Sequence, residues 1–231
     1  MHQLSIILLF SVMSFGLSRP SDVNKDGWLW LFDGSSTEHW VGVKSSRFPA
    51  QGWVIEDDAL VVNKGGNSEN RGGDIITREK YGNFDLQFEF KLTPGANSGV
   101  KYFVRIYEDG RVLGCEYQLI DDEGNKDISN DPDGKRLTAS LYELFEPEGK
   151  KLKPAGTWNK SRIVVQGNHV EHWLNGKKVL EYERGSEAFL AARAKSKFKD
   201  VADFGLIEEG YIMLTDHGDE VAYRNIRIRK L

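Results

Sequence analysis

The stretch FDLQFEFKL at residues 84–92 is the clearest indication of the class of fold, because apolar and polar side chains alternate along it without a break. A period of two places all five apolar side chains, from Phe84 to Leu92, on one face of an extended strand. The other face carries Asp85, Gln87 and further polar groups. The stretch therefore predicts a half-buried strand with one face in water.

Alternating segments and turn signals recur along the rest of the chain. Residues 162–182 predict three strands of a meander, because Gly167-Asn168 and Asn175-Gly176 are two-residue turn signals between alternating segments. One stretch, residues 187–195, has helical propensity. The pattern favours an all-β fold, a two-sheet antiparallel jelly-roll sandwich with one short helix near 187–195. Further strands are predicted at residues 53–62, 100–107, 116–120, 211–215 and 221–230.

The composition narrows the class of protein. Lys and Arg number 31 and Asp and Glu number 35, so the formal charge is −4, which disfavours a nucleic-acid partner held by its phosphates. Cys115 is the single cysteine, and one thiol can supply neither an internal disulfide nor a Cys-ligated zinc site. Nothing in the sequence predicts a protein partner.

The N-terminal residues are typical of a targeting signal. Residues 4–17 (LSIILLFSVMSFGL) are apolar or small and carry no charge, a length typical of the core of a signal peptide and too short for a membrane span. We therefore predict that residues 1–18 are a signal peptide and that the chain is exported to the periplasm or the extracellular space. Residues 28–231 are predicted to form a single domain. A buried N-terminal strand or helix is the alternative for the first segment.

The segment GCEYQLIDD at residues 114–122 is the most informative about chemistry. In a strand, Glu116 and Gln118 share one face and Tyr117 lies on the other. Because Tyr is the better core residue, we expect Glu116 and Gln118 to point into solvent or into a cleft. The same parity argument makes Lys101 a candidate for that cleft. The alternatives are an ordinary polar outer face and an ordinary exposed lysine.

Other polar groups are weaker candidates. His217 closes a strand beside a turn, where functional side chains often lie, although each histidine taken singly is more often structural. His169 and His172 lie on opposite faces of a strand and are not expected to share a metal. The acidic loop at residues 121–135 has the composition of a hard-cation site but lacks EF-hand spacing, so a solvated loop is the alternative.

A retaining glycosidase needs two carboxyl groups about 5–5.5 Å apart. The neighbour of Glu116 on its strand face is Gln118, which is not a carboxylate. The strand therefore predicts a solitary acid or base, and a retaining endo-glucanase is disfavoured.

Several short motifs, taken in their order and spacing, resemble the 3-keto-disaccharide hydrolase domain family, also described as 3-keto-glucoside 1,2-lyase and 3-keto-2-hydroxyglucal hydratase. The resemblance extends over about residues 28–231. The matching stretches are LFDG at 31–34, NSGVKYF at 97–103, EYQ at 116–118, TASLY at 138–142, GTWN at 156–159, HWLNG at 172–176, DHG at 216–218 and RNI at 224–226.

The resemblance implies a concanavalin A-like jelly roll secreted by bacteria and a small-molecule substrate, a glucoside already oxidised at C3. A ketone at C3 acidifies the proton on C2, since the resulting carbanion is an enolate. A base can remove that proton, the C1 leaving group then departs by elimination, and water can add back, so that the net reaction is hydrolysis or a 1,2-lyase reaction. Such a route needs no carboxyl pair, which agrees with a solitary Glu116.

The resemblance also suggests roles for individual residues. Glu116 would act as the base or as a metal ligand, Lys101 or a bound divalent cation would stabilise the enolate, and His217 would transfer the second proton. If a cation is present, Glu116, Asp121 and His217 are its possible ligands. The residues expected to hold sugar hydroxyls are Asn97, Gln118, Tyr142 and Arg224.

Two positions depart from the pattern of the family. Asn125 lies in the loop where a His is expected, and Thr215 precedes Asp216 where a Gln is expected. These departures leave open an altered substrate or an inactive site. The competing function is a non-catalytic, lectin-like carbohydrate-binding module, because this class of sandwich hosts both.

Overall fold

The computed structural model describes residues 23–62 and 71–231, so the predicted signal peptide lies outside the described residues. The strands are β1 (Trp28–Phe32), β2 (Trp40–Gly42), β3 (Trp53–Glu56), β4 (Ala59–Val62), β5 (Ile75–Tyr81), β6 (Phe84–Leu92), β7 (Asn97–Ile106), β8 (Val112–Ile120), β9 (Asn159–Gln166), β10 (His169–Leu174), β11 (Lys177–Glu183), β12 (Gly210–Leu214) and β13 (Val221–Lys230). One 3-10 helix, η3 (Lys126–Asn130), and one α-helix, α1 (Glu187–Lys195), complete the described elements.

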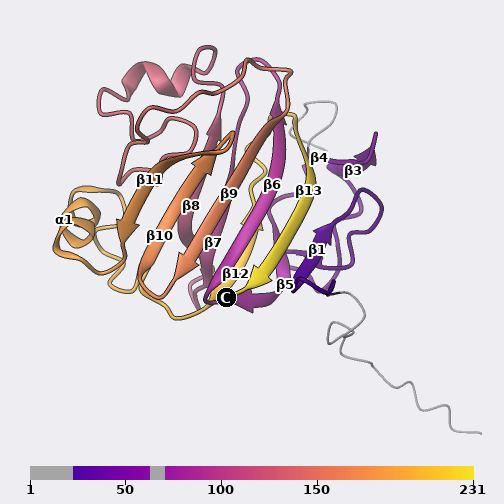
Figure 1. Cartoon of the computed structure of the whole chain (residues 1–231), viewed down its shortest axis with the longest axis horizontal. Coiled ribbons are helices and arrows are strands. Elements are labelled where there is room, and N and C mark those ends of the chain that lie inside the picture. Colours follow the sequence, from indigo (N-terminus) through magenta and orange to yellow (C-terminus); the bar gives the residue numbers. More distant parts are fainter. Residues whose placement is uncertain (1–22, 63–70) are drawn as a thin grey trace, which may run out of the picture.

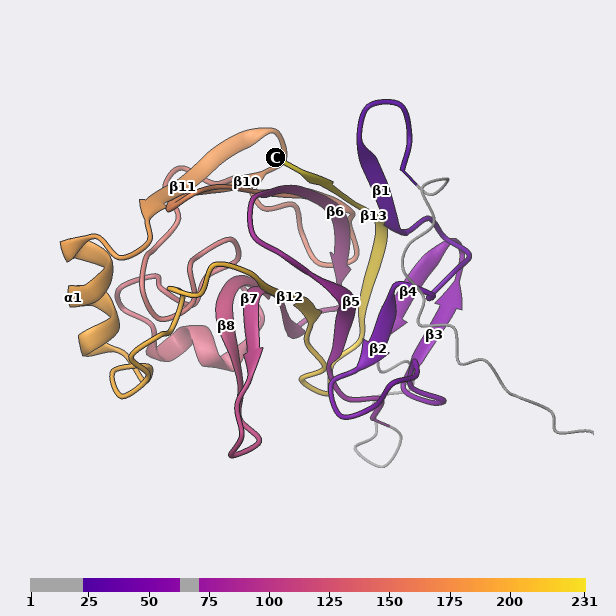
Figure 2. The same cartoon turned by 90° about the horizontal axis from the view of Figure 1, so that it is seen from below.

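The strands form two antiparallel sheets, which confirms the predicted two-sheet sandwich. The larger sheet has eight strands in the order β11-β10-β9-β6-β13-β4-β3, with β1 paired to β13. The smaller sheet has the order β2-β5-β12-β7-β8. In the view of Figure 1 the larger sheet lies in front, and Figure 2 shows it curving over the smaller sheet. Each sheet therefore has one face in the core and one face turned outward.

The predicted strand at residues 84–92 is β6, with the same bounds. Its five apolar side chains lie in the core between the sheets. The opposite face of β6 is less exposed to solvent than expected. Asp85 on this face is buried in an ion pair with Arg162 of β9 and Arg229 of β13. The predicted meander is β9–β10–β11, and the predicted helix is α1, whose N-terminus is capped by the Ser186 hydroxyl accepting from the Phe189 amide.

One strand prediction was wrong. Residues 53–62 are not a single strand but the hairpin of β3 and β4. Asp57 and Asp58 both have positive φ, 50° and 57°, which closes a two-residue turn that Asp tolerates better than most residues. The Asp57-Asp58 pair is the signal in the sequence that could have indicated this turn.

The core contains a polar network as well as apolar side chains. The His172 ring is fully buried, with Nε2 2.8 Å from the Tyr102 hydroxyl and Nδ1 2.9 Å from the Ala139 carbonyl oxygen. The Tyr102 hydroxyl lies 2.6 Å from that of Tyr182. His169 points to the opposite side of β10, as its spacing from His172 predicts. Within the described part of the chain, no helix combines the length and apolarity needed to cross a membrane.

Candidate functional site

Glu116 lies on the outward face of the smaller sheet. Its backbone is opposite Lys101 of β7, which is in turn opposite Met213 of β12. The neighbouring residues Tyr117 and Val100 point into the core, so strand parity directs Glu116 and Lys101 away from it. The expectation that Glu116 leaves the core is confirmed. The residue is nevertheless only 6% exposed.

The Glu116 carboxylate is held between a cation and a glycine. Its Oε2 lies 3.6 Å from Lys101 Nζ. The side chain folds over Gly99 of β7, where a Cβ would overlap Oε1 and would lie 2.9 Å from Cδ. Gly99 therefore supplies the space into which the carboxylate bends, and only a residue without a side chain leaves that space open.

Two amide side chains extend the same face by one step along the strands. Gln118 Nε2 donates to Asn97 Oδ1 at 2.8 Å. Gln118 is 2% exposed, and Gly99 is its partner on β7. The structure thus brings together four of the predicted site residues, Glu116, Lys101, Gln118 and Asn97.

A loop segment covers the free edge of β8 and adds a phenol to the group. Residues 138–142 run along β8, where the Ala139 amide donates to the Gln118 carbonyl and the Tyr142 amide donates to the Glu116 carbonyl at 3.0 Å. Tyr142 therefore lies beside Glu116. Burial raises the pKa of Tyr142 to about 12, and the charges of Glu143 and Glu116 add to the increase. The phenol is therefore a hydrogen-bond donor at neutral pH.

Lys197 is a site residue that the sequence analysis missed. It follows α1, and its Nζ lies 4.3 Å from the centre of the Tyr142 ring. Desolvation lowers the pKa of Lys197, with Glu116 opposing this change and Lys101 adding to it. Its position in the series Lys195, Lys197 and Lys199 is that of an ordinary surface lysine, so no signal in the sequence marks it.

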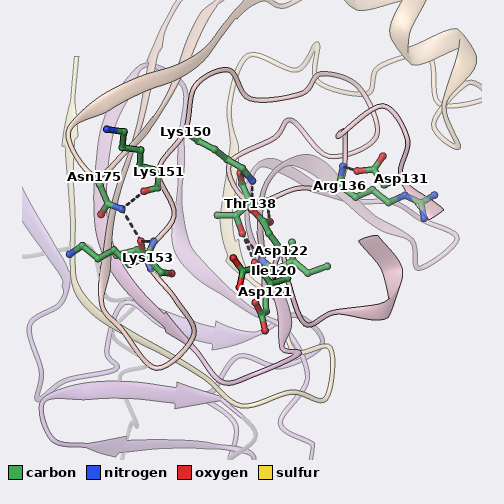
Figure 3. Close-up of polar contacts among 12 residues, drawn as sticks. Ile120, Asp121, Asp122, Asp131, Arg136, Thr138, Lys150, Lys151, Lys153 and Asn175 are labelled. Carbon is green, nitrogen blue, oxygen red and sulfur yellow. Dashed lines mark hydrogen bonds and ion pairs between the residues drawn. The ribbon is translucent and has the colours of Figure 1, made fainter. Parts of the chain in front are cut away.

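The covering segment is anchored by polar contacts that Figure 3 shows. The Asp122 carboxylate accepts from the Thr138 amide at 2.9 Å and forms an ion pair with Lys150. The Thr138 hydroxyl bonds the backbone of Ile120 in both directions, accepting from its amide at 2.9 Å and donating to its carbonyl at 2.6 Å. These contacts hold residues 138–142, and with them Tyr142, against the edge of β8.

Carboxylates of the acidic loop after β8 accept hydrogen bonds from backbone amides. Asp121 accepts from the Gly95 amide at 2.7 Å, and Asp131 accepts from the Arg136 amide at 2.6 Å. Asn125 caps η3 by accepting from the Asp127 amide at 2.8 Å and donates to the Gly95 carbonyl at 2.6 Å. This position, where a His was expected, therefore has a structural role in this chain.

The structure does not gather the possible metal ligands Glu116, Asp121 and His217. The single cluster with metal-ligand spacing among residues 23–62 and 71–231 is His169, Glu171 and Glu181. It lies on β10 and β11 of the larger sheet, where the Lys178 ammonium already contacts both carboxylates.

His217 and Arg224 make hydrogen bonds with groups other than Glu116. His217 is exposed in a turn, and its carbonyl oxygen accepts from Arg71 Nη2 at 2.6 Å. Arg224 lies on the other sheet, because Tyr223 points into the core and the next residue of β13 must point away from it. There Arg224 donates from Nε to Glu89 Oε2 at 2.8 Å and stacks on Trp158 at 4.1 Å.

A cavity lies beside the apolar part of the outward face of the smaller sheet. The apolar cluster Val41, Ile76, Val104 and Met213 lies on this face, with Met213 next to Lys101. Val43 and Val112 pack against the cluster and line a cavity of about 530 Å³. Its lining comes from β2, the segment before β5 and the start of β8, and it includes none of the residues grouped around Glu116.

The chain is similar to known proteins in its sequence and in its fold. The sequence profile of the family described as "3-keto-alpha-glucoside-1,2-lyase-like domain" matches residues 27–229. A protein of Bacteroides thetaiotaomicron named 3-keto-disaccharide hydrolase is 34% identical over 233 residues, which cover 90% of this chain and 80% of that protein.

Solved structures of similar chains share the fold. A protein of Parabacteroides distasonis described as a glycosyl hydrolase is 31% identical, with a TM-score of 0.78 over 89% of this chain and 94% of the other. A second protein of the same organism and description is 28% identical, with a TM-score of 0.66 over 88% and 99% of the two chains.

Proposed function

Because this chain belongs to the 3-keto-alpha-glucoside-1,2-lyase-like domain family, we propose that it is a carbohydrate-active enzyme that cleaves 3-keto-glucosides by removing the proton on C2. The observation that carries the proposal is the Glu116 carboxylate, placed 3.6 Å from the Lys101 ammonium and beside Tyr142, whereas the nearby Glu143 carboxylate is paired with Arg136. No second carboxylate is required for this route, in contrast to a retaining glycosidase.

Glu116 takes the C2 proton in the first step. The electron pair of the C2–H bond moves into a C2–C3 double bond, and the ketone oxygen becomes an enolate oxygen. Lys101 and Lys197 carry positive charge beside Glu116 and stabilise this oxygen electrostatically. Asn97 and Gln118 bond to sugar hydroxyls and orient the ring.

The second step expels the leaving group. The enolate reforms the C3 carbonyl, a C1–C2 double bond forms, and the C1–oxygen bond breaks. Tyr142, which is protonated at neutral pH, gives its proton to the departing oxygen, and the Lys197 ammonium over its ring stabilises the phenolate that remains. Water then adds at C1 and a proton returns to C2, which gives net hydrolysis.

The family resemblance allows a divalent cation at Glu116, Asp121 and His217. These residues do not fit that task in this structure, because their ligand atoms do not all lie within 4.8 Å of one another. The reaction steps above therefore use the side chains of the chain alone.

Glucose release from 3-keto-trehalose tests the proposed activity. Glu116→Gln is expected to lower kcat by about 10²–10⁴-fold, because the amide cannot accept the C2 proton. Glu187→Gln, at the exposed start of α1, is the matched control and should keep the wild-type rate. Binding of the keto sugar without release of glucose by the wild type would favour the lectin-like alternative.

We also propose that the chain is exported with residues 1–18 removed. The support is the uncharged apolar run at residues 4–17. N-terminal sequencing of the protein recovered from outside the cytoplasm tests this, and an intact Met1 would contradict it.

A further inference from the structure

A second hollow lies on the opposite side of the molecule from Glu116. It has a volume of about 600 Å³ and opens on the outward face of the larger sheet. A β-bulge in β13 marks its position, because the register with β6 shifts between Arg224 and Arg227 and Asn225 has a φ of 52°. None of the residues proposed for cleavage of the keto sugar lines this hollow.

Five side chains form a continuous row through the hollow, one from each of five neighbouring strands. Trp173 of β10 is opposite Arg162 of β9, which is opposite Gln87 of β6. Gln87 is opposite Arg227 of β13, which is opposite Trp30 of β1. Figure 1 shows these strands side by side. Four strand spacings separate the two indoles, about 19 Å, which is the length of a short oligosaccharide.

The row has the chemistry of a sugar-binding surface. Trp30 is 39% exposed, and Trp173 is partly exposed. A guanidinium lies over each ring, with Arg227 Cζ 5.7 Å from the centre of Trp30 and Arg162 Cζ 5.5 Å from that of Trp173. An indole offers a flat apolar face on which the C–H face of a pyranose ring can stack. Between the two indoles, guanidinium and amide groups offer directed hydrogen bonds for hydroxyl and carboxylate oxygens.

The charge of the row favours an acidic ligand. Lys160, Arg162 and Arg227 line the hollow with a single carboxylate, that of Glu89. Arg162 is already paired with Asp85 through two hydrogen bonds of 2.7 and 2.8 Å. Arg227 instead donates to the neutral Gln87 Oε1, and no carboxylate pairs with it among the residues that the structure describes. The guanidinium also lies 4.5 Å from the centre of the Trp28 ring, so its present partners are neutral and none of them neutralises its charge.

We propose that the outward face of the larger sheet, along the row Trp173–Arg162–Gln87–Arg227–Trp30, binds a carboxylated oligosaccharide of the uronic-acid type. The sugar rings stack on the two indoles, and a carboxylate pairs with the Arg227 guanidinium. This site is separate from the proposed cleavage site, and it would hold the protein on an acidic polysaccharide without taking part in the reaction.

Isothermal titration with trigalacturonate tests the proposal, with neutral cellotriose and a hexaglutamate peptide as comparisons. We expect trigalacturonate to bind at least about tenfold more tightly than either comparison, and to bind more weakly as salt is raised. Arg227→Gln and Trp173→Ala should each weaken it by at least about tenfold, and Arg227→Lys by less.

Matched controls separate this site from other effects. Arg105→Gln, an exposed arginine of β7 in the smaller sheet, should leave trigalacturonate binding unchanged. Glu116→Gln should also leave it unchanged, so the result is independent of the proposed cleavage activity. Thermal unfolding of each variant verifies folding. Absence of trigalacturonate binding, equal binding of cellotriose or hexaglutamate, or binding that Arg227→Gln and Trp173→Ala leave intact would each overturn the proposal.

Discussion

At the scale of single residues, Gly99 determines where the Glu116 carboxylate lies. Its φ is not in the left-handed region, so glycine is needed here for space rather than for backbone conformation. The carboxylate reaches over β7 only because no Cβ occupies that position. The NSGVKYF motif thus contributes to the site through a missing side chain as well as through Asn97 and Lys101.

Replacing Gly99 by alanine should displace the carboxylate. The new Cβ would meet the flexible end of Glu116, which can swing away, so we expect kcat on 3-keto-trehalose to fall by about 10²-fold with little change in stability. Gly42→Ala in β2 of the same sheet meets only ordinary contacts and is the control. Unchanged kcat for Gly99→Ala would show that the bent carboxylate is not the reactive arrangement.

His172 gives the fold a dependence on pH. Burial lowers its pKa to about 4 from the ordinary 6.5, so the folded state holds it neutral while the unfolded chain binds a proton. Its contribution is fully present above pH 6.5 and is lost as the pH falls toward 4, by up to about 3 kcal/mol. Urea unfolding at pH 7, 5.5 and 4 should show this loss. His172→Gln should flatten the slope, and an equally steep slope in the variant would contradict the assignment.

At the scale of elements, the segment at residues 138–142 depends on a largely buried ion pair. Desolvation lowers the pKa of Lys150, and the charge of Asp122 opposes that change. Removing one partner leaves a charge without compensation in a poorly hydrated place, whereas removing both does not. The pair therefore fixes the segment that carries Tyr142.

Asp122→Asn should lower the free energy of unfolding by about 3 kcal/mol, and the double variant Asp122→Asn/Lys150→Met should lose less than that. Urea unfolding of Asp122→Asn, of Lys150→Met and of the double variant measures the coupling free energy between the two side chains. We also expect Asp122→Asn to reduce glucose release, because Tyr142 is no longer held beside Glu116. Additive losses in the cycle would argue against the pair as the anchor.

At the scale of the whole molecule, the two sheets separate the polar groups into two surfaces that cannot meet. Arg224 belongs to the larger sheet and Gln118 to the smaller, with the apolar core between them. Arg224→Gln should therefore leave kcat/KM on 3-keto-trehalose within about twofold of the wild type, whereas Gln118→Ala should lower it by about tenfold through a lost hydrogen bond to the sugar. A large loss in Arg224→Gln would mean that the substrate reaches the other sheet.

Much of this arrangement could be anticipated from local pattern. Alternation at residues 84–92 and the turn at Asn175-Gly176 predicted β6 and the meander, because burial of one sheet face imposes a period of two. The same parity predicted that Glu116, Lys101 and Gln118 leave the core. It also could have placed Arg224 outside the core, but it could not show on which of the two sheets that residue lies.

Local sequence patterns predicted β6, the meander β9–β11, α1 and the family, because these depend on neighbours along the chain and on motifs in a fixed order. They did not predict β1, β2 or β5, and they merged β3 and β4 into one strand. Which strand faces share a surface depended on how the two sheets pack in the folded chain. This packing brought Lys197 from beyond α1 to Tyr142, turned Asp121 to the backbone, and put Arg224 on the sheet opposite to that of Glu116. The physical reason is that pairing between distant strands follows from burial of the whole core, and no local period encodes the partner that a strand finds.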